Sequence, residues 1–225
     1  MRLDLLAVAP HPDDAELGVG GTLAKAARAG RAVGVLDLTR GELGSKGDPE
    51  TRAREAEAAA QVLGLAWRAN LGLPDGGVAD APEPARALAA LLRRTRPRAV
   101  LAPHPEDRHP DHVAAAALVR RAVHLAGLVR ADVEGRPHKP ERLLYYPGNA
   151  PVPPDLIVDV SDVIEVWEAA VRAFVSQFEG EDVSETVGPA GLQARRALRR
   201  YWGNLAGVTY AEPLVSPRPW PIDLP

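Results

Sequence analysis

The sequence predicts an α/β fold in which a Rossmann-like, doubly wound and mostly parallel sheet has helices on both faces. Short apolar runs, which are typical of strands buried on both faces, alternate along the chain with Ala-, Glu- and Arg-rich stretches of helical length. The chain has 225 residues, of which 46% are hydrophobic, so it can form a sizeable core without disulfides or a structural metal. It contains no apolar stretch of about 18 residues, the length that a membrane-spanning helix needs.

The first half of the chain alternates strand and helix. Leu3–Ala9 is a nearly continuous apolar run and predicts the first strand, after which a loop is expected over residues 10–16. A helix is expected over residues 20–29, with Gly30 as its C-terminal cap. The other elements predicted for this half are strands over residues 32–38, 67–71 and 99–102, helices over residues 49–63, 83–95 and 110–125, and a turn over residues 73–77.

The second half is richer in proline, glycine and charged residues. Beyond Gly127 we expect extra strands over residues 143–146 and 156–160 and extra helices over residues 163–178 and 190–202, which complete the same domain. The tail from Pro213 onwards is rich in proline and is expected to lie extended over the surface.

The composition excludes several classes of protein. The sequence contains no cysteine, which excludes thiolate nucleophiles, iron–sulfur clusters, zinc fingers and disulfide frameworks, so a metal would have to be bound by His, Asp or Glu. The net charge is −3 and the basic residues form no cluster, so we expect no binding to nucleic acid or to a membrane surface. The N-terminal apolar run is too short for a secretory signal peptide, and we therefore expect a cytoplasmic protein that binds a small molecule.

Two stretches that follow predicted strands are rich in histidine and carboxylates. In an open parallel sheet, ligands bind beyond the carboxyl ends of the strands, and both stretches are expected at this edge. One reads His-Pro-Asp-Asp-Ala-Glu over residues 11–16, and the other covers residues 103–112. Together they contain four of the six histidines of the chain, which makes them the first candidates for a functional site.

These residue types are those that bind zinc at a catalytic site, where three protein ligands leave one position for water. His11, Asp14 and His112 could supply the three ligands, and Fe(II) or Co(II) would fit the same set. A base is still needed to take a proton from the water, and Asp13 is well placed for this role. If His109 caps the helix that follows, it lies on the same side as His112 and could lean over the metal.

Asp111 has two possible roles that can coexist. It could orient a metal-binding histidine from behind, or it could simply be a carboxylate that interacts favourably with a helix N-terminus.

The paired motifs HPDDxE at residues 11–16 and HPDH at residues 109–112 resemble those of the LmbE-like, or PIG-L type, family of zinc-dependent N-deacetylases, which act on N-acetylglucosamine conjugates. The resemblance extends over most of the chain and implies a single deacetylase domain over residues 1–225, an N-deacetylase activity and a homo-oligomer. Four shorter stretches look like the deacetylases of the bacillithiol pathway, which act on N-acetylglucosaminyl malate: DRHPDH at residues 107–112, LPDG at 73–76, SQF at 176–178 and TYAE at 209–212.

The resemblance also implies roles for individual residues. It assigns the metal ligands to His11, Asp14 and His112, the general base to Asp13 and a protonated histidine to His109, with Asp111 beside them. It also implies that Arg52 binds a carboxylate of the substrate, with Arg54 as a rival. Asp75, which could equally cap its turn, and Arg108 are further candidates for contact with the substrate. We expect Glu16 to be structural and His104 not to be a ligand.

Other functions are compatible with parts of the pattern. His11, Asp13 and His112 could form the facial triad of a non-haem iron oxygenase, but that interpretation explains neither Asp14 nor His109. The glycines at residues 18–21 form only a weak match to a dinucleotide-binding fingerprint, so a Rossmann-like nucleotide-binding module is a third alternative. Within the deacetylases, inositol and chitooligosaccharide conjugates present the same acetamido group as the malate conjugate.

Overall fold

The computed structural model describes residues 1–178 and 187–219 of the protein. Its centre is a five-stranded sheet in the order β3-β2-β1-β4-β5, in which every neighbouring pair is parallel. The strands are β1 (Leu5–Ala9), β2 (Val33–Thr39), β3 (Trp67–Leu73), β4 (Ala99–Pro103) and β5 (Arg142–Tyr146). The order reverses direction between β1 and β4, as in other doubly wound sheets, so the predicted fold class is confirmed.

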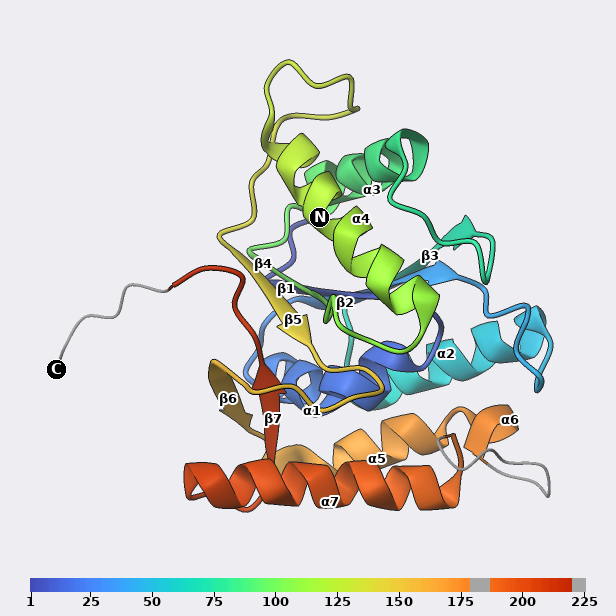
Figure 1. Ribbon diagram of the computed structural model, residues 1–225, viewed down its shortest axis with the longest axis vertical. Coiled ribbons are helices and arrows are strands. Elements are labelled where there is room, and N and C mark those ends of the chain that lie inside the picture. Colours follow the sequence, from blue (N-terminus) through green and yellow to red (C-terminus); the bar gives the residue numbers. More distant parts are fainter. Residues whose placement is uncertain (179–186, 220–225) are drawn as a thin grey trace, which may run out of the picture.

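Helices cover both faces of the sheet (Figure 1). One face carries α3 (Pro82–Thr95) and α4 (Pro110–Gly127), and the other carries α1 (Asp14–Arg28) and α2 (Pro49–Leu63). A further layer lies below α1 and α2 and consists of α5 (Ile164–Arg172), α6 (Val175–Phe178) and α7 (Pro189–Ala206).

The central strand β1 shows why the sheet needs two helical layers. Leu6 and Val8 point into the core on the α3–α4 side, whereas Ala7 and Ala9 point into the core on the α1 side. All four side chains are fully buried, as the alternation of a strand covered on both faces requires.

The prediction for the first helix was wrong at its start, because α1 begins at Asp14 instead of residue 20. Asp13 occupies the N-cap position, and Asp14 and Glu16 lie in the first turn, where carboxylates interact favourably with the helix dipole. The glycines permit close packing inside the helix: a Cβ atom at Gly18 would lie 2.5 Å from the ring of Tyr146, and one at Gly20 would lie 3.0 Å from Trp167. The metal-ligand candidate Asp14 is therefore on a helix and not in a loop.

The helix α1 is interrupted at Val19, whose φ of −139° is not helical. Backbone groups near the interruption are satisfied by side chains from the C-terminal part of the chain. Trp167 Nε1 donates a hydrogen bond to the Glu16 carbonyl oxygen at 2.9 Å, and Glu212 accepts one from the Gly21 amide at 3.0 Å. Insertion of side chains into the hydrogen-bond ladder is a recognised cause of a helix kink.

Two predictions for the C-terminal part were also wrong. The helix expected over residues 163–178 is divided into a short 3-10 turn (Ser161–Val163), α5 and α6. The tail expected from Pro213 instead contributes to a buried strand, β7 (Ala211–Leu214), which pairs antiparallel with β6 (Leu156–Asp159). Pro213 is tolerated because β7 has no partner on its other side in the described residues beyond a single bridge from Val215 to Tyr145.

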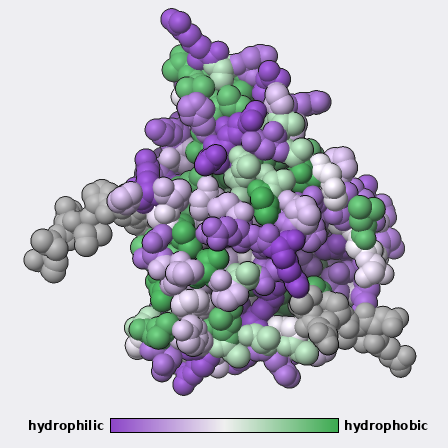
Figure 2. All heavy atoms as spheres, in the orientation of Figure 1, coloured by the Kyte–Doolittle hydropathy of each residue, from purple (hydrophilic) through white to green (hydrophobic). Residues whose placement is uncertain are grey.

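The face of the molecule shown in Figure 2 mixes hydrophilic and hydrophobic residues. Among the described residues, no helix has both the length and the apolar character that crossing a membrane requires.

Candidate metal centre and active site

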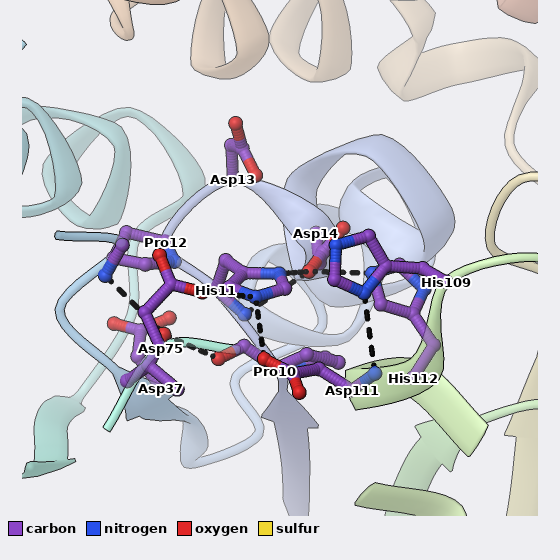
Figure 3. Close-up of polar contacts among 12 residues, drawn as sticks. Pro10, His11, Pro12, Asp13, Asp14, Asp37, Asp75, His109, Asp111 and His112 are labelled. Atoms are coloured by element: carbon purple, nitrogen blue, oxygen red, sulfur yellow. Dashed lines mark hydrogen bonds and ion pairs between the residues drawn. The ribbon is translucent and has the colours of Figure 1, made fainter. Parts of the chain in front are cut away.

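The candidate site lies beyond the carboxyl ends of β1 and β4, the two neighbouring strands between which the sheet order reverses (Figure 3). His11, Asp13 and Asp14 come from the loop after β1 and the first residue of α1. His109 and His112 come from the start of α4, which follows β4. Such a reversal point leaves a crevice in which doubly wound proteins bind their ligands.

Three side chains there offer a suitable set of metal ligands. The Asp14 Oδ2 atom lies 3.0 Å from His11 Nδ1 and 3.2 Å from His112 Nε2, and the three ligand atoms all lie within 4.8 Å of one another. Two imidazoles and one carboxylate are the donors that zinc accepts at catalytic sites, so the residues fit this ion. The two histidines hold the pKa of the Asp14 carboxyl well below its ordinary value, although burial alone would raise it.

The second ring nitrogen of each histidine faces a carboxylate. His11 Nε2 lies 3.1 Å from Asp75 Oδ1 and 3.3 Å from Asp111 Oδ2, and His112 Nδ1 lies 3.2 Å from Asp107 Oδ2. Carboxylates in this position fix the tautomer and the orientation of a metal-binding histidine. The arrangement therefore prepares His11 Nδ1 and His112 Nε2 to face a metal ion.

Asp107 was not identified from the sequence as a site residue. Its side chain is fully buried, and its oxygens accept hydrogen bonds from the His109 amide at 2.8 Å and from the Asn149 amide at 2.8 Å. The Asn149 side chain donates a further bond at 2.9 Å. The only signal in the sequence was its position at the start of the DRHPDH stretch, which does not show where the carboxylate points.

The position of Asp111 is compatible with both roles that the sequence left open. It lies in the first turn of α4, and it also contacts His11 and accepts hydrogen bonds from the amides of Gly76 at 2.8 Å and Val78 at 3.3 Å. Asp75 lies in the same turn as Gly76, and its second oxygen accepts a bond from the Leu43 amide at 2.9 Å. Both carboxylates lie behind His11, away from its Asp14-facing nitrogen, where they support that ring.

Asp13 is adjacent to the ligand set and has an unusual environment. It is only 7% exposed, and its φ of 117° is in the left-handed region that residues other than glycine rarely adopt. Burial raises the pKa of its carboxyl to about 7, although the Arg52 guanidinium acts in the opposite direction. A carboxyl that titrates near neutral pH is suited to accepting and returning a proton.

Arg52 does not project into an open site, as a clamp for a substrate carboxylate would. It is 4% exposed, and its guanidinium donates to the Pro12 carbonyl at 2.6 Å and the Gly41 carbonyl at 3.0 Å, with Asp13 Oδ2 at 3.4 Å. This placement favours a role in supporting the loop that holds Asp13. The rival, Arg54, is exposed and donates to Thr51 Oγ1 in its own helix.

His109 lies over the ligand set, with its ring centroid 4.9 Å from those of His11 and His112. As predicted, it caps α4 and is followed by Pro110 at the first helical position. Its Nδ1 atom accepts a hydrogen bond from the Asp111 amide at 3.2 Å, which leaves Nε2 as the protonated nitrogen of a neutral ring. Burial and the two neighbouring histidines lower the pKa of His109 from its ordinary value.

The remaining candidates lie outside this cluster. Arg108 is exposed and lines a neighbouring cavity. His104 packs edge-on against Tyr145, with the ring centroids 6.1 Å apart, and is not part of the ligand groups found among the described residues. Glu16 is fully buried and forms an ion pair with Arg68 at 2.6 Å, as expected of a structural residue.

A protein-family model matches the part of the chain that contains these residues. Residues 6–123, just over half of the chain, match the family model described as GlcNAc-PI de-N-acetylase, or PIG-L. The chain belongs to the PIG-L family. It is 34% identical to the diacetylchitobiose deacetylase of Thermococcus kodakarensis, over 92% of this chain and 80% of that protein.

A second PIG-L relative is the 1D-myo-inositol 2-acetamido-2-deoxy-alpha-D-glucopyranoside deacetylase of Kineococcus radiotolerans. It is 32% identical over 56% of this chain, which spans about half of that protein (47%). Both of these curated relatives are deacetylases, as is the family that the model describes, and the chain is accordingly a hydrolase that acts on amide bonds.

Solved structures show the same fold. A conserved protein from Thermus thermophilus is 58% identical with a TM-score of 0.92, over 98% of this chain and 97% of that one. The N,N'-diacetylchitobiose deacetylase of Pyrococcus horikoshii is 27% identical with a TM-score of 0.82, over 93% of this chain and 82% of that one. A 4-carboxy-2-hydroxymuconate hydratase of Pseudomonas putida, 23% identical over 100% and 99% of the two chains, reaches 0.86. Proteins with this fold therefore catalyse different reactions, and the residues of the site determine which one.

Proposed function

We propose that the protein is a zinc-dependent N-deacetylase that converts an N-acetylglucosamine conjugate into the free amine and acetate. The observation that carries this proposal is the convergence of His11, Asp14 and His112, with Asp13 beside them, at the reversal point of the sheet. The curated relatives act on N-acetylated glucosamine conjugates according to their names, which supports the same class of substrate here.

A divalent metal held by His11, Asp14 and His112 would supply Lewis-acid chemistry, which polarises an amide carbonyl and makes water easier to deprotonate. Fe(II) or Co(II) would be held by the same donors.

In the proposed reaction, Asp13 accepts a proton from the water that adds to the acetyl carbonyl carbon. Its pKa near 7 allows it to be ionised for this step and to be protonated afterwards. His109 donates a hydrogen bond from Nε2 to the carbonyl oxygen, on which negative charge develops. Asp13 then returns the proton to the amine nitrogen as the carbon–nitrogen bond breaks, so that the base is regenerated.

The other residues of the site have supporting roles in this proposal. Asp107, Asp111 and Asp75 orient the two metal-facing histidines, and Arg52 positions the loop that contains Asp13. None of these four side chains is assigned a direct contact with the acetyl group.

We propose N-acetylglucosaminyl malate as the substrate, because four short stretches of the sequence resemble the deacetylases that act on it. The test is an acetate-release assay with zinc-loaded protein and four substrates: the malate conjugate, the inositol conjugate, diacetylchitobiose and methyl N-acetylglucosaminide. We expect the highest kcat/KM with the malate conjugate. Equal values with the malate and methyl aglycones would contradict the substrate assignment, and the absence of acetate from all four would contradict the deacetylase itself.

A further inference from the structure

A cavity of about 220 Å³ lies beside the candidate metal centre. Its walls come from α1, from the segment that follows β5 and from α7, and Arg108 contributes from the loop after β4. The residues that matter for its chemistry are Arg108, Gly148, Asn149 and Arg195.

The cavity and the metal centre share a wall. Gly18, which lines the cavity, lies one helical turn beyond the ligand candidate Asp14 on α1. Gly148 packs so closely on the other side that a Cβ atom there would lie 2.8 Å from His112 Nδ1 and 2.3 Å from Asp107 Oδ2. The cavity therefore adjoins the metal centre and is a candidate position for the other end of a substrate whose acetamido group lies at the metal.

Arg195 differs from Arg196 and Arg199, two neighbouring arginines of α7 that form ion pairs. Arg196 pairs with Glu165 at 2.6 Å, and Arg199 pairs with Glu212 at 2.7 Å. Arg195 forms no ion pair within the described part of the chain, and the hydrogen bond found for it is donated to the Gly148 carbonyl oxygen at 3.1 Å. Its guanidinium therefore retains donors that face the cavity.

Two neighbouring arginines at this cavity favour an anion, although the nearby carboxylates of the metal centre act against one. Arg195 is only partly exposed, and burial lowers its pKa, whereas the charges of Asp14, Asp13 and Asp107 act in the opposite direction. Arg108 adds a second positive charge to the same cavity and is close enough to lower the pKa of Arg195 further. A guanidinium binds a carboxylate through two parallel hydrogen bonds, which makes arginine the preferred residue for this ligand.

We propose that Arg195, assisted by Arg108, binds a carboxylate on the aglycone of the substrate and selects acidic N-acetylglucosamine conjugates over neutral ones. This inference rests on the proposed function, because it places the sugar between the metal centre and the cavity. Arg195 is a specificity-determining residue in this scheme and takes no part in the chemical step.

The kinetic test compares Arg195→Gln with the matched control Arg196→Gln, whose arginine is adjacent in sequence but pairs with Glu165 and Glu168. The quantity measured is the ratio of kcat/KM for N-acetylglucosaminyl malate to that for methyl N-acetylglucosaminide. We expect Arg195→Gln to lower this ratio about 10- to 100-fold, the usual range for loss of a charged hydrogen bond, mainly through KM. Arg195→Lys should recover part of the ratio, and Arg196→Gln should leave it unchanged. An unchanged ratio in Arg195→Gln would overturn the proposal.

A binding test separates this inference from the deacetylase activity. Glucosaminyl malate, which has no acetyl group, is titrated into chelator-treated protein by calorimetry, with methyl glucosaminide as the neutral probe. We expect Arg195→Gln to weaken binding of the malate compound about tenfold or more without affecting the neutral probe. If the protein binds glucosaminyl malate selectively but releases no acetate from any substrate, the anion site is supported and the deacetylase activity is contradicted. If Arg195→Gln weakens binding of both probes equally, the anion site is contradicted.

Discussion

Arg199 and Glu212 form a buried ion pair inside the interruption of α1. Arg199 Nη2 lies 2.7 Å from Glu212 Oε1 and donates a second bond to the Leu17 carbonyl oxygen at 2.8 Å. Glu212 accepts hydrogen bonds from the amides of Gly21 at 3.0 Å and Thr22 at 2.6 Å. The cation thus satisfies a carbonyl before the break and the anion satisfies two amides after it, so the pair takes the place of missing helical hydrogen bonds.

This arrangement predicts that Glu212→Gln is strongly destabilising. The substitution leaves Arg199 buried with its charge unpaired, and removal of one partner from a buried pair costs about 3–5 kcal/mol. We expect a loss of this size in the free energy of unfolding, measured by urea denaturation of the metal-free protein. The control is Glu165→Gln, which removes a partner of Arg196 that is 77% exposed and should cost less than about 1 kcal/mol. Similar losses in the two variants would show that the pair does not stabilise the break.

The proposed general base predicts a separation of activity from metal content. Asp13→Asn removes the proton acceptor, and we expect kcat for acetate release to fall about 100- to 10,000-fold. Because Asp13 is not a ligand candidate, zinc per chain, measured by elemental analysis, should stay as in the unsubstituted protein. Asp80→Asn is the control, since that residue pairs with Arg121 at the surface and should leave kcat unchanged. Full activity in Asp13→Asn would exclude it as the base.

The contact between Asp107 and His112 predicts an effect on metal affinity. Asp107→Asn weakens the interaction between residue 107 and His112 Nδ1. Loss of such a supporting carboxylate typically lowers metal affinity about 10- to 100-fold. The dissociation constant for zinc is measured by competition with a chromogenic chelator. Asp132→Asn, at an exposed position, serves as the matched control. An unchanged dissociation constant in Asp107→Asn would mean that His112 is oriented without this carboxylate.

Metal binding should depend on pH with a defined sign. Burial alone would lower the pKa of His11, but its hydrogen bond to Asp14 and the charges of Asp14 and Asp75 raise it to about 9 in the metal-free protein. Only the neutral ring can bind a metal, so binding must release the proton that His11 carries at neutral pH. We expect the apparent affinity for zinc to increase with pH up to about 9, by about tenfold per pH unit for each proton released. Affinity that is constant between pH 6 and pH 8 would contradict this protonation state.

Much of the fold was predictable because the strands are short apolar runs and the helices carry clear end signals. The helix over residues 49–63 and the cap of α4 at His109 are confirmed at the residue level. The start of α1 was not predictable from local pattern, since Gly18 and Gly20 resemble helix breakers and are explained only by their contacts with Tyr146 and Trp167.

The sequence indicated which residues gather at the candidate site, but it did not indicate most of the contacts between them. His11 and His112 could be paired because parallel strands end at one edge of a sheet, which needs no knowledge of side-chain direction. Asp107 was not identified, and Arg52 was expected to contact the substrate. The contacts of both residues depend on the direction in which a loop or helix points the side chain. The sequence pattern carries no information on that direction.

The hydrogen bonds at the interruption of α1 join segments that are synthesised at different times. The amide of Thr22 is satisfied by a carboxylate 190 positions further along the sequence, and the carbonyl of Leu17 by a guanidinium 182 positions further. During synthesis, the helix that carries Asp14 therefore lacks these partners until Arg199 and Glu212 have left the ribosome. Asp14, a candidate ligand in the first turn of α1, thus lies on a helix whose backbone bonding is complete only after residue 212 has been synthesised.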